Sequence, residues 1–265
     1  MLKSFTPNEM ELSGTEIARK VGIHKTTAHR ILSTLAKDGI LDRNLKTGKY
    51  TIGHELFALG SLYLSTTDIL KTADPVVKTL NDLTGEVVNV GIREGNNIIL
   101  VMKEESKYPV RFFHHIGSIM PAHTSAIGKA LLSELTEAQL DSLYPEEKLR
   151  VITKKTIATK TELKQELERI RETGVSFDRE GIYDGVEGIG SVMHDASGKA
   201  VAGMSISVPV FRLEQIGHER LLAILIRLGT SLVSYRLGYQ DKNTPVRDVQ
   251  EIRSWWQQDR LDLTS

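Results

Sequence analysis

The stretch GTEIARKVGIHKTTAHRILS at residues 14–33 predicts two short helices that cross at a steep angle. Ala18 provides the small side chain that such a crossing needs, and Gly22 allows positive φ in the turn. Thr15 is expected to cap the first helix, and the second helix is expected to open at residues 25–27. The side chains expected to pack between the helices are Ile17, Val21, Ala28, Ile31, Leu32 and Leu35.

The polar residues left outside this apolar pattern indicate a DNA-binding surface. They cluster at the start of the second helix, where a helix in the major groove presents its side chains to base edges. A predicted β-hairpin follows, with strands at residues 40–43 and 49–52, and its basic tip is typical of the wing of a winged helix-turn-helix. The residues predicted to contact DNA are Thr15, Lys25, Thr26, Thr27, His29, Arg30, Arg43, Lys46 and Lys49.

Charge is unevenly distributed along the 265 residues. Lys and Arg total 34, as do Asp and Glu, but residues 1–50 hold nine basic and five acidic side chains. This basic excess of four suggests that only the head meets a polyanion. The absence of cysteine excludes disulfides, thiolate metal sites and cysteine nucleophiles. No apolar run of membrane-spanning length and no signal peptide is recognisable, so we expect a cytoplasmic protein with no membrane partner. We also expect no metal and no cofactor.

Four parts are expected along the chain. Residues 1–53 form the winged helix-turn-helix, 54–71 a linker helix, 72–240 a larger effector-binding domain, and 241–265 a tail. The linker carries an apolar stripe of Leu56, Leu59, Leu62 and Tyr63 that has no partner within the head, so we expect it to pack against a second copy of the chain. In the tail, the Trp255–Trp256 pair is expected to dock on the body or on a neighbouring subunit, and packing of one ring into the core is the simpler outcome.

Beyond the linker the pattern predicts an α+β domain, an antiparallel sheet flanked by helices. The expected strands cover residues 86–92, 98–103, 110–115, 190–194 and 199–208. The expected helices cover residues 68–84, 125–134, 137–144, 161–173 and 214–237.

Three features of this domain converge on one small-molecule site. The helix after Ser125 would expose the amides of Ala126, Ile127 and Gly128, which attract a carboxylate. Ser205 and Ser207 lie two apart on a predicted strand, so both hydroxyls face one way; the simpler alternative is that they lie on a solvated strand face. Asp178, in a short polar segment, would accept from a ligand hydroxyl or bind in its protonated form, and Met120 would add an apolar wall.

The head and the segments at residues 124–130, 178–180 and 202–209 together resemble the IclR family of bacterial transcription regulators. The resemblance spans residues 1–239. It implies a winged helix-turn-helix, a linker helix and a GAF/PAS-like effector domain, in dimers or tetramers that control catabolic operons. The effectors it implies are small organic, sugar or aromatic acids. The effector pocket it implies comprises Met120, Ala126, Ile127, Asp178, Gly188, Ser205 and Ser207.

The chain departs from the family pattern at several positions. Gly188 stands where a cysteine is common and Gly181 where a second acidic residue is common, so we expect a wider pocket or a freer loop. Only residues 1–5 remain of the family's first helix, so we expect either a misplaced start codon or a shortened helix.

Two other functional classes compete with a DNA-binding regulator. An enzyme would need a recognisable nucleophile, metal or phosphate motif, and none of the common ones occurs, so no catalytic residue is expected. A sensor whose head binds protein would keep its partner when Lys25 and Arg30 are replaced by alanine, and would not bind DNA. Salt-sensitive DNA binding distinguishes the regulator from both.

Overall fold

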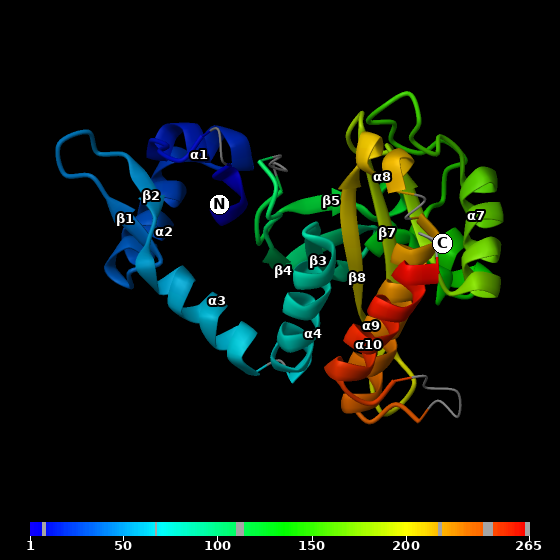
Figure 1. The fold of residues 1–265 in the computed structure, drawn as a ribbon. Coiled ribbons are helices and arrows are strands. Elements are labelled where there is room, and N and C mark those ends of the chain that lie inside the picture. The colour runs from blue at the N-terminus through cyan, green and yellow to red at the C-terminus, as the bar shows by residue number, and fades with distance from the viewer. Residues whose placement is uncertain (7–8, 67, 110–113, 217–218, 241–245, 263–265) are drawn as a thin grey trace. The chain divides into compact units, whose positions relative to one another are not determined.

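The computed structural model describes residues 1–6, 9–66, 68–109, 114–216, 219–240 and 246–262 (Figure 1). The chain forms two compact units, Met1–Thr67 and Asp68–Ser265. Of the linker helix expected over residues 54–71, residues 54–66 form a helix of the first unit, whereas residues 68–71 belong to another helix in the second unit. Each unit has its own core.

The first unit is a winged helix-turn-helix. Its elements are η1 (Leu2–Ser4), α1 (Gly14–Val21), α2 (Lys25–Lys37), β1 (Leu41–Arg43), β2 (Tyr50–Ile52) and α3 (His54–Thr66). Strands β1 and β2 pair antiparallel, as predicted for the wing. Gly22 ends α1 with φ +71°, which confirms the left-handed turn expected there.

Two details of the predicted head are wrong. Ser13, not Thr15, caps α1: its side chain accepts from the amide of Glu16, whose carboxylate in turn accepts from the Ser13 amide. Val21 and Ile31 are 40% and 39% exposed and lie outside the core. The core of the head also includes residues from outside the two helices. Its buried side chains are those of Leu12, Ile17, Ala18, Ala28, Leu32, Leu41 and Tyr50. Periodicity within the two helices could not show that residues from outside them complete the core.

The second unit is the predicted α+β domain. Its strands are β3 (Val87–Glu94), β4 (Asn97–Glu104), β5 (Ile119–Pro121), β6 (Ser176–Arg179), β7 (Val186–His194) and β8 (Ala200–Pro209). They form one antiparallel sheet in the order β5-β4-β3-β8-β7-β6. Its helices are α4 (Asp68–Thr84), η2 (Ala122–Thr124), α5 (Ala126–Ser133), α6 (Glu137–Leu143), α7 (Lys160–Thr173), α8 (Val210–Ile216), α9 (Glu219–Arg236) and α10 (Val249–Asp262).

Helices cover both faces of this sheet. α4 and α9 pack on one face and α10 packs on those two helices (Figure 1). α5 packs on the other face, where it contacts β6, β7 and β8, and α7 packs on α5. Glycines on the sheet permit the close approach of α5: a Cβ at Gly203 would lie 3.0 Å from a methyl of Ile127, and one at Gly190 would lie 3.0 Å from Ala126.

Some boundaries in this unit differ from the predicted ones. Strands β5 and β6 were not predicted, because three or four residues are too few to show an alternating pattern. Asp178, which was expected in a short polar segment, lies on β6. The helix expected over 214–237 is two helices, α8 and α9, and residues 217–218 between them lie outside the described residues. Of the strand expected at 110–115, residues 110–113 lie outside the described part, and His114 and His115 are not in a strand.

The tail packs on the body of the second unit through α10. Trp256 is 5% exposed and Trp255 is half-buried, which confirms the expectation that one ring enters the core.

Candidate effector site and nucleic-acid interface

A basic groove of about 640 Å³ crosses the first unit. Six of the nine predicted DNA-contacting residues line it: Thr15, Lys25, Thr26, His29, Arg30 and Arg43. Thr27, Lys46 and Lys49 lie outside the groove. Eight of the nine are exposed, whereas Lys49 is half-buried with its ammonium 3.9 Å from a carboxylate oxygen of Glu11.

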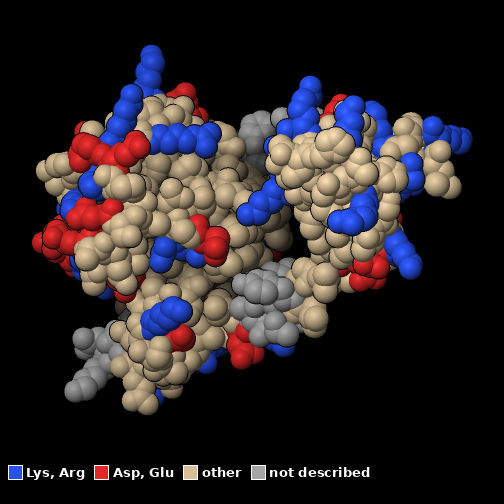
Figure 2. All heavy atoms as spheres, turned by 180° about the vertical axis from the view of Figure 1, so that it is seen from behind, with Lys and Arg blue, Asp and Glu red and all other residues tan. Residues whose placement is uncertain are grey.

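The start of α2 supplies four of the nine residues that line this groove. Residues 25, 26, 29 and 30 fall on one helix face because they are spaced by a full helical turn. The ring of His24 caps the helix by accepting from the amide of Thr26, 3.4 Å away. On the face of this unit seen in Figure 2, Lys and Arg side chains predominate over acidic ones. A cationic helix N-terminus beside a basic hairpin is suited to a phosphate backbone.

A separate small cavity of about 50 Å³ lies in the second unit, between the N-terminus of α5 and the sheet. It brings together all seven residues predicted for the effector pocket. The residues lining it are Asn89, Leu100, His114, Met120, Ser125, Ala126, Ile127, Asp178, Ile182, Gly188, Ser205 and Ser207.

The strand register explains how residues distant in sequence meet in this cavity. Asp178 on β6 lies opposite Gly188 on β7, and Gly188 lies opposite Ser207 on β8. Asn89 on β3 lies opposite Ser205. Gly188 leaves room between α5 and the strands, since a Cβ there would meet the Cβ atoms of Ala126 and Asp178 at 3.4 Å. Ser205 is 4% exposed, so the alternative of a solvated strand face is wrong for it.

The N-terminus of α5 provides amide donors at one end of the cavity. Ser125 is the N-cap, and its hydroxyl accepts from the amide of Gly128 at 2.9 Å. The expectation of three available amides is therefore wrong for Gly128, whose donor is satisfied within the protein. The amides of Ala126 and Ile127, the first two residues of the helix, remain to meet an anionic group.

Asp178 is the titratable group of the cavity. Its side chain is buried, and its Oδ1 accepts from the Gly181 amide at 2.6 Å. Burial raises its pKa to about 7, although the Gly181 hydrogen bond and the nearby Lys129 ammonium oppose the rise. Near neutral pH the carboxyl therefore exists in both forms, and its protonated form would donate to a ligand oxygen.

Two polar residues of the cavity were not predicted. Asn89 donates from Nδ2 to the Ser207 hydroxyl at 3.2 Å, while its buried Oδ1 has no partner among the described residues. His114 has a buried Nε2 that likewise lacks a described partner, and burial lowers its pKa. An asparagine inside the apolar run of residues 87–92 was a usable signal for Asn89. His114 carried no such signal, because it reaches the cavity from a loop.

The described residues contain no group of three or more His, Cys, Asp or Glu side chains able to hold a metal ion. Within the same residues, no helix has the length and apolar character needed to cross a membrane.

Comparisons with known proteins match both units. The family model described as bacterial transcriptional regulator IclR C-terminal matches residues 61–233, and the IclR helix-turn-helix domain matches residues 1–45. The HTH-type transcriptional repressor AllR of Salmonella typhi is 36% identical over 203 residues, which are 77% of this chain and 75% of AllR. The crystal structure of Thermotoga maritima IclR has a TM-score of 0.69 at 26% identity, covering 90% of this chain and 96% of that one.

A further solved structure is an IclR homologue of Microbacterium hydrocarbonoxydans complexed with 4-hydroxybenzoate. It has a TM-score of 0.76 at 18% identity and covers 89% of this chain and 95% of that one. At this identity the likeness is one of fold.

Proposed function

Since the chain belongs to the IclR family of bacterial transcription regulators, which bind DNA and are not enzymes, we propose that it controls a catabolic operon in response to a small organic-acid or sugar-acid effector. The observation that carries this proposal is the small cavity, in which helix amides, two serines and a part-protonated aspartate surround one space. We place the regulator in the cytoplasm, where its operator lies.

The chemistry of the cavity favours a ligand with a carboxylate and a second oxygen. The carboxylate would lie against the amides of Ala126 and Ile127 and the hydroxyls of Ser205 and Ser207, while protonated Asp178 would donate to the other oxygen. One water molecule needs roughly 10–15 Å³ of cavity volume. The cavity of about 50 Å³ therefore has room for a few non-hydrogen atoms, which corresponds to an acid of about two or three carbons if the protein does not rearrange. The 4-hydroxybenzoate bound by the Microbacterium homologue is also a hydroxylated carboxylate.

The exposed face of α3 supports a dimer. Phe57, Leu59 and Leu62 are 80%, 52% and 60% exposed, which is costly for large apolar side chains in water. The side chain of Tyr63, also expected on this stripe, lies outside the described residues. We propose that α3 packs on its counterpart in a homodimer, or in a tetramer built from two dimers. Effector binding would then change the spacing of the two heads and decide whether both α2 helices reach major grooves about 34 Å apart.

Two experiments test this function. Fluorescence anisotropy with DNA from upstream of the gene should show salt-sensitive binding that Lys25→Ala and Arg30→Ala weaken and Lys164→Ala, on the second unit, leaves unchanged.

Thermal shift with glyoxylate, glycolate, pyruvate and larger sugar and aromatic acids should identify a stabilising acid. Its effect should be lost in the double variant Ser205→Ala/Ser207→Ala. No DNA binding, with and without these acids, would leave the protein-binding sensor as the better account.

A further inference from the structure

The small cavity contains a hydrogen-bond acceptor that the fold leaves unused. Asn89 of β3 donates from Nδ2 to the Ser207 hydroxyl at 3.2 Å, and its Oδ1 is buried with no partner among the described residues. A buried amide oxygen without a hydrogen bond lowers stability, because it has lost its water and gained no partner in exchange. Folding therefore does not account for an asparagine here, whereas a ligand with a donor group would.

The sheet places Asn89 beside the two serines of the cavity. Asn89 and Ser205 lie directly opposite each other on the paired strands β3 and β8. Residues opposite each other in an antiparallel pair present their side chains to the same face of the sheet. The hydrogen bond to Ser207 then holds the amide next to the second serine, and all three residues line the cavity. The unused acceptor thus belongs to the wall that the proposed function assigns to the ligand.

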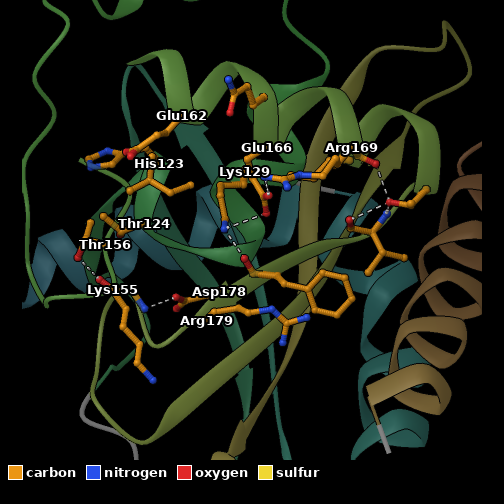
Figure 3. A pocket seen from close by; sticks show the side chains of 17 residues that line it. His123, Thr124, Lys129, Lys155, Thr156, Glu162, Glu166, Arg169, Asp178 and Arg179 are labelled. Carbon is orange, nitrogen blue, oxygen red and sulfur yellow. Dashed lines mark hydrogen bonds and ion pairs between the residues drawn. The ribbon is translucent and has the colours of Figure 1, made fainter. Parts of the chain in front are cut away.

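The other strongly polar groups around the cavity already have partners. At the β6 end, Oδ1 of Asp178 accepts from the Gly181 amide at 2.6 Å (Figure 3). The ammonium of Lys129 donates to the Phe177 carbonyl oxygen, lies 3.4 Å from Oε1 of Glu166, and does not line the small cavity. No lysine or arginine is among the described residues that line it. Selection between similar acids there depends on matching donors with acceptors, and not on ion pairing.

His114 brings a second unpartnered polar atom to the cavity. Its ring stacks on that of Tyr183, with centroids 4.9 Å apart, and its buried Nε2 has no partner in the described part of the chain. Burial lowers the pKa of His114, so the ring is neutral at pH 7. A neutral imidazole presents either an N–H or a lone pair at Nε2. A ligand hydroxyl complements both forms, because it donates and accepts, whereas a ketone oxygen only accepts.

We propose that the small cavity selects 2-hydroxy acids over the corresponding 2-oxo acids, and that Asn89 determines this selection by accepting from the ligand hydroxyl. The inference rests on the proposed effector function and names the class of its ligand. A 2-oxo acid has the same carbon skeleton and carboxylate, but its ketone oxygen has no hydrogen to donate. It would leave the Asn89 oxygen unpaired in the complex, and a site built around a hydroxyl rejects an analogue that lacks it.

Isothermal titration calorimetry at pH 6 with L-lactate, D-lactate and pyruvate tests this selection, because lactate differs from pyruvate only in having a hydroxyl in place of the ketone. The pKa of Asp178 is about 7, so at pH 6 its carboxyl is mostly protonated and both acids meet the same charge. Asn89→Ala removes the acceptor, and Asn89→Val removes it with a side chain suited to a strand. Asn96→Ala is the matched control, since Asn96 is exposed in the turn between β3 and β4 and does not line the cavity.

The tighter-binding lactate enantiomer should bind the parent protein at least about tenfold more tightly than pyruvate, because pyruvate leaves a buried acceptor unpaired. Asn89→Ala should bring this ratio of dissociation constants close to one, mainly by weakening lactate, and Asn96→Ala should leave it unchanged. A merely structural role of Asn89 would weaken both acids alike and leave the ratio as it is. If Asn89→Ala does not fold, the Asn89→Val result decides.

The proposal is overturned if pyruvate binds at least as tightly as lactate, if the ratio persists in the Asn89 variants, or if neither acid binds. In the first two cases, loss of binding in Ser205→Ala/Ser207→Ala would leave the proposed effector function intact. In the third case, the thermal-shift panel separates the two ideas. A larger acid whose effect depends on the serines would retain the function, whereas no response to any acid would remove both.

Discussion

Replacing Asp178 by asparagine should make the second unit more stable at high pH, by an amount that the structure predicts. The pKa of about 7 lies about 3 above the ordinary 3.8, which corresponds to about 4 kcal/mol. The native state holds this proton more tightly than the unfolded state. The stabilising effect of protonation is therefore complete below pH 4, falls as the pH rises, and is lost above about pH 7.

Asp178→Asn retains the Oδ1 acceptor for the Gly181 amide and removes the titration. Its free energy of unfolding relative to the parent protein should rise by about 1.4 kcal/mol per pH unit between pH 5 and 7 and then level off. Any constant cost of the extra amide hydrogens does not alter that slope. The slope is therefore the diagnostic quantity.

Urea denaturation at pH 5, 6, 7 and 8, followed by tryptophan fluorescence, measures this difference. Both tryptophans, Trp255 and Trp256, belong to the second unit, so the signal reports on the unit that holds Asp178. Asp141→Asn is the control, because hydrogen bonds from Lys164 and Lys160 lower the pKa of Asp141 and no such rise should appear from pH 5 to 8. A difference between Asp178→Asn and the parent that stays constant over this range would refute the assigned protonation behaviour.

Three further substitutions test packing and assembly. Gly128→Ala would place a Cβ 2.0 Å from the carbonyl oxygen of Ala122, so denaturation should show a loss of more than about 2 kcal/mol, and parent-like stability would contradict the close packing of α5. Trp256→Ala should cost about 3–5 kcal/mol and Trp255→Ala much less; equal losses in melting experiments would argue against the burial of one ring. Leu59→Asp on α3 should yield monomers in light scattering and weaken DNA binding, whereas an unchanged dimer would place the interface elsewhere.

The local sequence carried enough information for the head and for most elements of the second unit. Gly22 at the turn and the periodic apolar residues of α1 and α2 predict the helix-turn-helix, because turn geometry and helical periodicity are set by neighbours in the chain. For the same reason β7, β8 and the hairpin of β3 and β4 were foreseen from alternation and turn residues. The seven residues of the small cavity followed from family resemblance combined with serine spacing.

Long-range packing supplied what those local patterns lacked. Asn89 lines the small cavity because β3 pairs with β8, and His114 lines it because a loop brings it there. The periodicity of apolar residues gives no information on contacts between residues so far apart in the sequence. The Ser125 hydroxyl accepts a hydrogen bond from the Gly128 amide, and burial raises the pKa of Asp178 to about 7. Both properties depend on the folded environment of the group, which determines its hydrogen bonds and its solvation. Lys129 likewise becomes buried where α5 meets α7 and β6, two elements that lie far from α5 in the sequence.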